Sequence, residues 1–369
     1  MGKASPYASL SATRAVLDAH GLQAKYSLGQ NFLVNDDIVR KSLELAEVGP
    51  GDAVLEVGPG IGTLTCALLG AGAQVAAVER DADLPPVLAE TTAPWAERFA
   101  LVRKDALDLS AGDLAQAFDS LGVASGLGEG GAAPSRFGAA GTELTAPAAE
   151  LLPGFKLVAN LPYAVAATLV LDYFQRFPTM TSATVMVQRE VADRMMAHPG
   201  TKAYGAYTVK LGFFARPAGR FPVGPANFFP QPRVESAVIR LDRVAALGDA
   251  CASDPRAGAR TDDVPDSLAA SAADLSAACL MADAAFASRR KTLANSCKQF
   301  FSGRGAAGAR MAERLPELFA AAGIDSKRRG ETLDRAEFMR LACAWRSMSD
   351  AARGCKDEPS IESEEGPAV

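Results

Sequence analysis

Apolar and polar positions alternate along the first two thirds of the chain in a pattern that predicts an α/β domain. Residues 35–47 place apolar side chains at helical spacing behind an Asn-Asp cap, and residues 53–57 form a short apolar run that ends at glycines. Strands that alternate with helices form a parallel sheet covered on both faces. We expect strands at 53–57, 74–78, 100–103, 155–159, 182–188, 207–214 and 237–241, and helices at 35–47, 63–69, 84–91, 164–177 and 190–196.

Two Gly/Ala-rich stretches interrupt this alternation and suggest how the chain is divided. Residues 121–153 have little apolar periodicity and are interpreted as a surface insertion between two strands. Residues 243–270 have a similar composition and are interpreted as a linker. We expect an N-terminal arm (1–35), an α/β domain (36–242), the linker, a small helical domain (271–346) and a disordered acidic tail (347–369).

Composition excludes several classes of protein. The chain is 49% hydrophobic and 22% charged, which is a globular composition, and none of its apolar runs approaches the ~20 residues that cross a bilayer. Its N-terminal sequence lacks the pattern of a secretory signal, so we expect a cytoplasmic protein without a membrane partner. The six cysteines and two histidines are widely spaced, so we expect neither disulfides nor a metal site.

Charge is unevenly distributed behind the net value of −5. Residues 1–153 hold 10 Lys+Arg against 19 Asp+Glu, a net −9, whereas residues 154–240 hold 10 against 4, a net +6. Residues 271–346 hold 13 against 8, a net +5. Because screening confines charge effects to about 8 Å at physiological salt, the two basic blocks allow one face to bind a polyanion.

Polar or glycine-rich signals follow successive predicted strands, at the sheet edge where α/β proteins bind ligands. Gly58 and Gly60 belong to a glycine turn that allows close backbone approach and opens a helix. Glu79 ends the second strand at the spacing of a carboxylate that accepts ribose hydroxyls, and Asp105 ends the third, where it can accept from an adenine amine. Together they predict a cofactor that contains adenosine, which NAD and S-adenosylmethionine both do.

The tetrapeptide Asn160-Leu161-Pro162-Tyr163 after the fourth strand favours S-adenosylmethionine. An exocyclic purine amine is a poor nucleophile because its lone pair is delocalised into the ring. The Asn160 side-chain oxygen and a backbone carbonyl at Leu161 or Pro162 can accept its two N–H groups and free that lone pair. Pro162 fixes the turn, and Tyr163 offers a ring on which a flipped base can stack.

These segments resemble the bacterial small-subunit (16S) ribosomal RNA adenine N6-dimethyltransferase family. The resemblance runs in order across residues 25–342, so it is more specific than any single motif. It implies a Rossmann-like S-adenosylmethionine-dependent methyltransferase fold with a small C-terminal helical domain. The matching segments are Leu28-Gly29-Gln30-Asn31-Phe32-Leu33, Glu56-Val57-Gly58-Pro59-Gly60, Glu79 with Asp81, Asp105-Ala106, Asn160-Leu161-Pro162-Tyr163, 188–192, 228–238, 289–293 and 323–325.

Carried over residue by residue, the resemblance implies three groups of site residues. Cofactor contacts are expected at Asn31, Leu33, Gly58, Gly60, Glu79, Asp105 and Asn160. The catalytic group is expected at Asn160, Leu161, Pro162, Tyr163 and Phe228, with the target base clamped between Tyr163 and Phe228. Phosphate contacts are expected at Arg189, Arg194, Lys202, Arg289, Arg290 and Lys291.

The implied activity is transfer of methyl groups to N6 of two adjacent adenosines near the 3′ end of 16S rRNA in the 30S subunit, by a monomer that needs no metal. Two features depart from the family pattern: Ala164 stands where an Asn is usual, and the 121–153 insertion is atypical. Two alternatives remain open. The target could be an adenine of 23S rRNA, as in antibiotic-resistance methylases, or the chain could be an RNA-binding assembly or transcription factor without catalytic activity.

Overall fold

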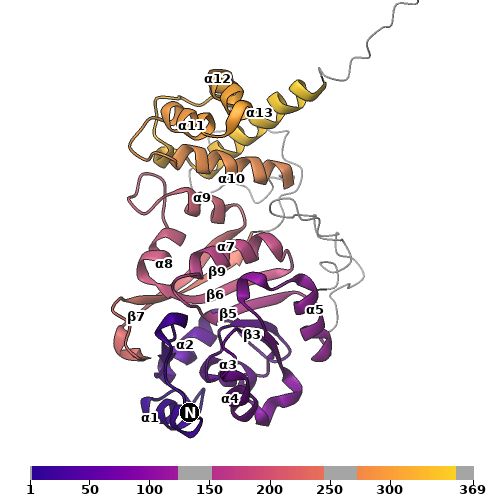
Figure 1. Cartoon of the computed structure of the whole chain (residues 1–369), viewed down its shortest axis with the longest axis vertical. Coiled ribbons are helices and arrows are strands. Elements are labelled where there is room, and N and C mark those ends of the chain that lie inside the picture. Colours follow the sequence, from indigo (N-terminus) through magenta and orange to yellow (C-terminus); the bar gives the residue numbers. More distant parts are fainter. Residues whose placement is uncertain (1, 124–151, 245–271, 355–369) are drawn as a thin grey trace, which may run out of the picture. The chain divides into compact units, whose positions relative to one another are not determined.

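The chain divides into two compact units, shown in a computed structural model that describes residues 2–123, 152–244 and 272–354 (Figure 1). The first unit comprises residues 1–198 and 211–247, and the second comprises residues 199–210 and 248–369. Residues 199–210 therefore belong with the second unit, whereas the sequence placed them in the α/β domain. Most of the expected insertion and nearly all of the expected linker lie outside the described residues.

A seven-stranded sheet forms the centre of the first unit, in the order β4-β3-β2-β5-β6-β9-β7. The five strands from β4 to β6 are parallel, and β9 and β7 are antiparallel to their neighbours. Strand β2, third in this order, is buried along its whole length, as its mainly apolar sequence predicts. The strands are β2 (Ala53–Val57), β3 (Gln74–Glu79), β4 (Phe99–Arg103), β5 (Phe155–Asn160), β6 (Met180–Gln188), β7 (Ala215–Val223) and β9 (Ser236–Arg243).

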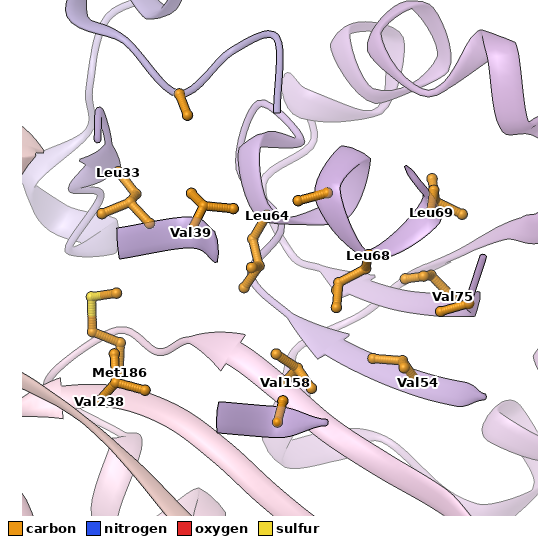
Figure 2. Close-up of a cluster of buried hydrophobic side chains, with 14 of the residues drawn as sticks. Leu33, Val39, Val54, Leu64, Leu68, Leu69, Val75, Val158, Met186 and Val238 are labelled. Carbon is orange, nitrogen blue, oxygen red and sulfur yellow. The ribbon is translucent and has the colours of Figure 1, made fainter. Parts of the chain in front are cut away.

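Helices cover both faces of this sheet because successive strand side chains point to opposite sides. On one face, Val54 and Val158 join a cluster with Leu68 and Val39 of the covering helices α3 and α2, as Figure 2 shows. On the other face, the ring of Phe155 contacts Phe118 and Phe177 near α5 and α7. The helices of this unit are α2 (Asp36–Ala46), α3 (Thr63–Gly70), α4 (Leu84–Thr91), α5 (Ala111–Ser120), α7 (Ala166–Arg176) and α8 (Arg189–Met195), whereas α9 (Ala206–Gly212) falls mostly in the second unit.

One predicted strand is wrong, and one strand of the seven-stranded sheet escaped the prediction. Residues 207–214 were expected to form a strand, but α9 occupies most of that segment. Its alternating apolar positions fit a short helix as well as a strand, so the pattern could not distinguish them. Strand β7 follows and contains Pro217 and Pro222, which normally argue against a strand. They are tolerated because β7 is the last strand of the sheet and pairs on one side only.

The N-terminal arm is structured and packs on the first unit. It contains α1 (Leu10–Ala19), whose first turn is capped by the Ser9 side chain, and η1 (Tyr26–Leu28). Strand β1 (Phe32–Leu33) pairs with β8 (Phe228–Phe229), which follows η4 (Pro225–Asn227), and Leu33 stands opposite Phe228. Two short helical turns flank β4: η2 (Ala93–Arg98) precedes it and η3 (Ala106–Asp108) follows it.

The second unit is helical, as predicted. Its helices are α10 (Ala272–Phe286), α11 (Leu293–Ser302), α12 (Gly305–Ala322) and α13 (Arg335–Gly354), with η5 (Gly330–Thr332) before α13. Leu293, Leu318 and Phe338 are fully buried in this unit. Helix α13 runs eight residues into the segment expected to be a disordered tail, so that prediction is wrong for residues 347–354.

Candidate active site

The carboxyl ends of β2, β3 and β5, together with residues 104–106 after β4 and part of the N-terminal arm, surround one cavity of about 570 Å³. The predicted convergence of strand ends at one edge of the sheet is thus confirmed. Ten of the residues predicted for the cofactor and the base line this cavity: Asn31, Leu33, Gly58, Gly60, Glu79, Asp105, Asn160, Leu161, Pro162 and Tyr163.

The turn after β2 depends on glycine for both its conformation and its packing. Gly58 and Gly60 have φ angles of 68° and 60°, a region that side chains rarely adopt. A Cβ on Gly60 would lie 3.2 Å from the ring of Phe32 in the arm. The turn therefore brings backbone next to the cavity and leads into the N-terminal end of α3, where free amides can face a ligand.

Glu79 ends β3 beside this turn and is 8% exposed. Its carboxylate accepts a hydrogen bond from the backbone N–H of Asp81 at 2.8 Å. Burial raises the pKa of Glu79 above its usual range, and backbone donors at Asp81 and Gly60 offset part of that effect. Glu79 therefore places a carboxylate with little solvent contact at the cavity wall, and this carboxylate can accept further hydrogen bonds.

A second buried acid, Glu56 of β2, also lines the cavity and was not among the predicted site residues. It is 1% exposed, and its Oε2 has no hydrogen-bond partner in the described part of the chain. Burial raises the pKa of Glu56 to about 8. The hydroxyl of Thr63, also at the cavity and 5% exposed, is similarly unpaired. The available signal was an acid inside an otherwise apolar strand.

Unpaired buried oxygens of this kind are unusual, since buried polar atoms normally have partners. Both oxygens lie on side chains that border the same cavity, so donors of a ligand bound there can satisfy them. A positively charged group with N–H donors would meet this need best, because it would also compensate the ionised form of Glu56.

Asp105 follows β4 and is held by two donors. Its Oδ1 accepts from the Leu107 backbone N–H at 3.0 Å, and its Oδ2 accepts from Nη1 of Arg80 at 2.9 Å. These bonds, that of Leu107 first, hold the pKa of Asp105 below its usual range. Arg80 also lines the cavity and was missed by the sequence analysis, because nothing in sequence links it to Asp105.

The Asn160 side chain is oriented by the N-terminal arm. Its Nδ2 donates to the backbone carbonyl of Asn31 at 3.0 Å. With the amide nitrogen so engaged, Oδ1 is the atom available to accept from a bound base. The Pro162 carbonyl accepts from the N–H groups of Val165 and Ala166 at the start of α7. No described residue donates to the Leu161 carbonyl, so of the two expected backbone acceptors Leu161 is the free one.

Tyr163 completes this group with a half-buried ring. Its hydroxyl shares a 2.6 Å hydrogen bond with Oγ of Ser236 in β9. Burial raises the pKa of Tyr163, so the phenol stays protonated at neutral pH. The ring is therefore fixed at both ends, by the backbone turn and by Ser236.

Comparison with known proteins decides which family the chain represents. A model of the ribosomal RNA adenine dimethylase family matches residues 21–249. The chain belongs to this family. The fold class and enzyme class expected from sequence are thereby confirmed.

Curated relatives match nearly the whole methyltransferase. A protein of Corynebacterium jeikeium is 35% identical over 339 residues, covering 89% of this chain and 93% of its own length. Another, from Pelotomaculum thermopropionicum, is 36% identical over 335 residues, covering 91% and 96%. Both relatives carry the name ribosomal RNA small subunit methyltransferase A.

Solved structures share the fold of this methyltransferase at low sequence identity. A dimethyladenosine transferase from Plasmodium falciparum superposes with a TM-score of 0.58 at 17% identity, covering 86% of this chain and 98% of that one. The 23S rRNA methyltransferase ErmE gives a TM-score of 0.51 at 21% identity, covering 85% and 99%. At these identities the likeness extends to the fold alone.

Phe228 of this methyltransferase does not lie where it could stack on the target base, as was expected. It is 2% exposed, packs in the core cluster of the first unit and does not line the cavity. The family resemblance implied that this ring clamps the target base together with Tyr163. Pairing of β8 with β1 turns it inward instead, so Phe228 is corrected to a core residue.

The basic residues expected to contact phosphates differ in their surroundings. Lys202 and Arg290 are exposed and have no partner among the described residues. Nζ of Lys291 donates to Gln299 at 3.0 Å. Arg189 and Arg194 are exposed in ion pairs with Glu235 and Glu190, which a phosphate can compete for.

The Arg289 side chain makes its hydrogen bonds within the helical unit. It donates to Glu331 at 2.8 Å and to the backbone carbonyls of Tyr204 and Thr201 at 2.9 Å. These bonds tie residues 199–210 to the helices, so Arg289 is corrected from a free phosphate contact to a structural residue. The triplet 289–291 lies in the turn between α10 and α11.

Two searches of the described residues gave negative results. No group of three or more His, Cys, Asp and Glu side chains there is arranged to hold a metal ion. No helix there combines the length and the apolar character needed to cross a membrane.

Proposed function

We propose that this enzyme transfers methyl groups from S-adenosylmethionine to N6 of two adjacent adenosines near the 3′ end of 16S rRNA in the 30S subunit. The observation that carries the proposal is the pair of free acceptors, Asn160 Oδ1 and the Leu161 carbonyl, at the same cavity as the buried acid Glu79. The proposed cellular location is the cytoplasm, where ribosomal particles assemble. The proposed active form is a monomer.

The residues of the cavity fit S-adenosylmethionine. Glu79 would accept from the ribose hydroxyls, and Asp105 would accept from the adenine amine through lone pairs that Leu107 and Arg80 leave free. The unpaired oxygens of Glu56 and Thr63 would accept from the methionine ammonium. When bound, the cofactor supplies a methyl group on a positively charged sulfur, so the protein needs no nucleophile of its own.

The protein's contribution at the target base is to orient it and localise its lone pair. Asn160 Oδ1 and the Leu161 carbonyl would each accept one N–H of the exocyclic amine. Tyr163 would hold the ring plane by stacking, which contributes about 1–3 kcal/mol per base. The N-terminal arm keeps the Asn160 amide from rotating, because its nitrogen is bound to the Asn31 carbonyl.

The names of the relatives support the small subunit as the target. Relatives that cover nine tenths of the chain are named as small-subunit methyltransferases. The likeness to a 23S rRNA methyltransferase is one of fold, at 21% identity. We therefore favour 16S rRNA over the 23S alternative, and exposed Lys202 and Arg290 are proposed to contact its phosphates.

Mass spectrometry of rRNA tests the proposal. Undermethylated 30S subunits are incubated with the enzyme and S-adenosylmethionine, and the 16S rRNA is digested and analysed. We expect two added methyl groups on each of two adjacent adenosines near the 3′ end. Methylation of 23S rRNA alone would favour the resistance-type alternative, and binding of 30S subunits without methyl transfer would favour the non-catalytic one.

A further inference from the structure

With Phe228 in the core, the aromatic side chains that line the cavity are Tyr26, Phe32 and Tyr163. Phe32 is 7% exposed and packs against the glycine turn, so it offers no open face. Tyr163 is half-buried and fixed through Ser236. Tyr26, in contrast, is 88% exposed, twice as much as any other large apolar side chain of the described residues. Its ring is an uncovered aromatic surface at the cavity rim.

The turn that carries Tyr26 is anchored on both sides. Before it, Nζ of Lys25 donates to Asp81 at 2.5 Å and to Asp83 at 2.6 Å. After it, Nε2 of Gln30 donates to the other oxygen of Asp81 at 2.7 Å. The turn itself closes through the Gly29 N–H, which donates to the Tyr26 carbonyl at 3.0 Å.

Asp81 is well suited to this anchoring because it is 5% exposed. Burial raises its pKa, but the donors at Lys25, Asp83 and Gln30 outweigh that effect and leave the pKa below its usual range. The carboxylate therefore stays ionised and the turn stays attached. A tyrosine on an anchored turn loses little conformational freedom when it binds a ligand.

We propose that Tyr26, at the cavity rim, stacks on an RNA base beside the target base held at Tyr163. The inference rests on the proposed function. A flat base suits a single exposed ring, whereas a protein partner needs a contiguous apolar patch. The other exposed large apolar side chains, Leu10, Leu107 and Val234, are not among the residues that line the cavity.

Steady-state methyl transfer to undermethylated 30S subunits tests this assignment with the full-length enzyme. For Tyr26→Ala we expect KM for 30S subunits to rise about tenfold, within the range of one lost base stack, with kcat changed less than about twofold. Tyr26→Phe keeps the ring and should restore KM. Leu10→Ala removes another exposed apolar side chain of the arm and should match the wild type.

Affinity for S-adenosylhomocysteine, measured by calorimetry on the same variants, separates stacking from damage to the cofactor site. The inference requires Tyr26→Ala to bind it like the wild type. An unchanged KM for Tyr26→Ala, or equal losses for Tyr26→Ala and Tyr26→Phe, would overturn the role of Tyr26 while the proposed function stands. If the wild type itself transfers no methyl group to 30S subunits, the proposed function fails and this inference fails with it.

Discussion

The side-chain nitrogen of Asn160 donates to the backbone carbonyl of Asn31 at 3.0 Å, across 129 residues of sequence. This bond links the N-terminal arm to the proposed base site and leaves Oδ1 of Asn160 as the available acceptor. The two orientations of an Asn side-chain amide, related by exchange of its oxygen and nitrogen, are similar in shape, so a neighbouring group has to select one of them. In the proposed mechanism, the arm would therefore support catalysis by fixing one of them.

Replacement of Asn160 by Ala should abolish most methyl transfer without unfolding the protein. The side chain is partly exposed, so its loss leaves the core intact, while the target amine loses an acceptor. We expect kcat to fall about 100-fold or more, as when a catalytic hydrogen-bond partner is removed elsewhere. Asn227→Ala loses an amide hydrogen bond to Asn35 away from the cavity and serves as the control. Near-normal turnover of Asn160→Ala would contradict the proposed activation.

Replacement of Glu79 by Ala should weaken cofactor binding selectively. A hydrogen bond to a charged group contributes about 1.5–3 kcal/mol, so affinity for S-adenosylhomocysteine should fall roughly 10- to 150-fold. Affinity for the RNA should stay nearly unchanged, because Glu79 is buried at the end of β3. Glu90→Ala, at an exposed acid on α4, should alter neither affinity. Equal loss of both affinities in Glu79→Ala would refute the site assignment.

Stability should depend on pH through Glu56. Its pKa is raised from 4.5 to about 8, so between these values the folded protein holds a proton that the unfolded chain releases. The free energy of unfolding should therefore fall as pH rises from about 4.5 to about 8, by up to about 1.4 kcal/mol per pH unit from this group. The raised pKa of Glu79 acts in the same direction.

Denaturant titrations of the cofactor-free enzyme at several pH values check this slope. Glu56→Gln keeps the shape but cannot ionise, so its slope should be shallower than that of the wild type. Glu44→Gln, at an exposed acid on α2, should retain the wild-type slope. A Glu56→Gln protein with the full wild-type slope would mean that another group carries the pH dependence.

Replacement of Phe228 by Ala separates a core role from a stacking role. Because the ring is buried in the cluster beneath β1 and β8, its removal should lower the free energy of unfolding by about 3–5 kcal/mol. Phe228→Leu should lose much less, since it refills most of the volume. Unfolding in urea gives both values. If Phe228→Ala were as stable as the wild type and only its KM for 30S subunits rose, the ring would have to stack on RNA after all.

Much of the site was predictable because the chemistry sits at strand ends. Glu79 and Asp105 could be located from the apolar runs that precede them, and a parallel sheet brings such ends to one edge. Glu56 was not predicted, although its charge inside an apolar strand was visible. Its proposed role depends on the lack of a hydrogen-bond partner at Oε2, and hydrogen-bond partners are set by packing.

The errors share a physical origin in long-range pairing. The strand β7 was missed because its prolines are acceptable only at an edge, and edge position is a property of the whole sheet. Arg289 was expected at phosphates because sequence shows a basic triplet, whereas the fold places Glu331 and two carbonyls around it.

The sequence by itself determined the α/β class, the strand-end acids and the Asn160–Tyr163 segment, because local periodicity and motif spacing are written in neighbouring residues. Only the tertiary structure decided that Phe228 lies in the core, that Tyr26 is exposed at the cavity rim, and that Asn31 orients Asn160. These relations depend on which distant segments pair. A one-residue change in the register of β1 against β8 would exchange inward and outward rings, and no local pattern of residues specifies that register.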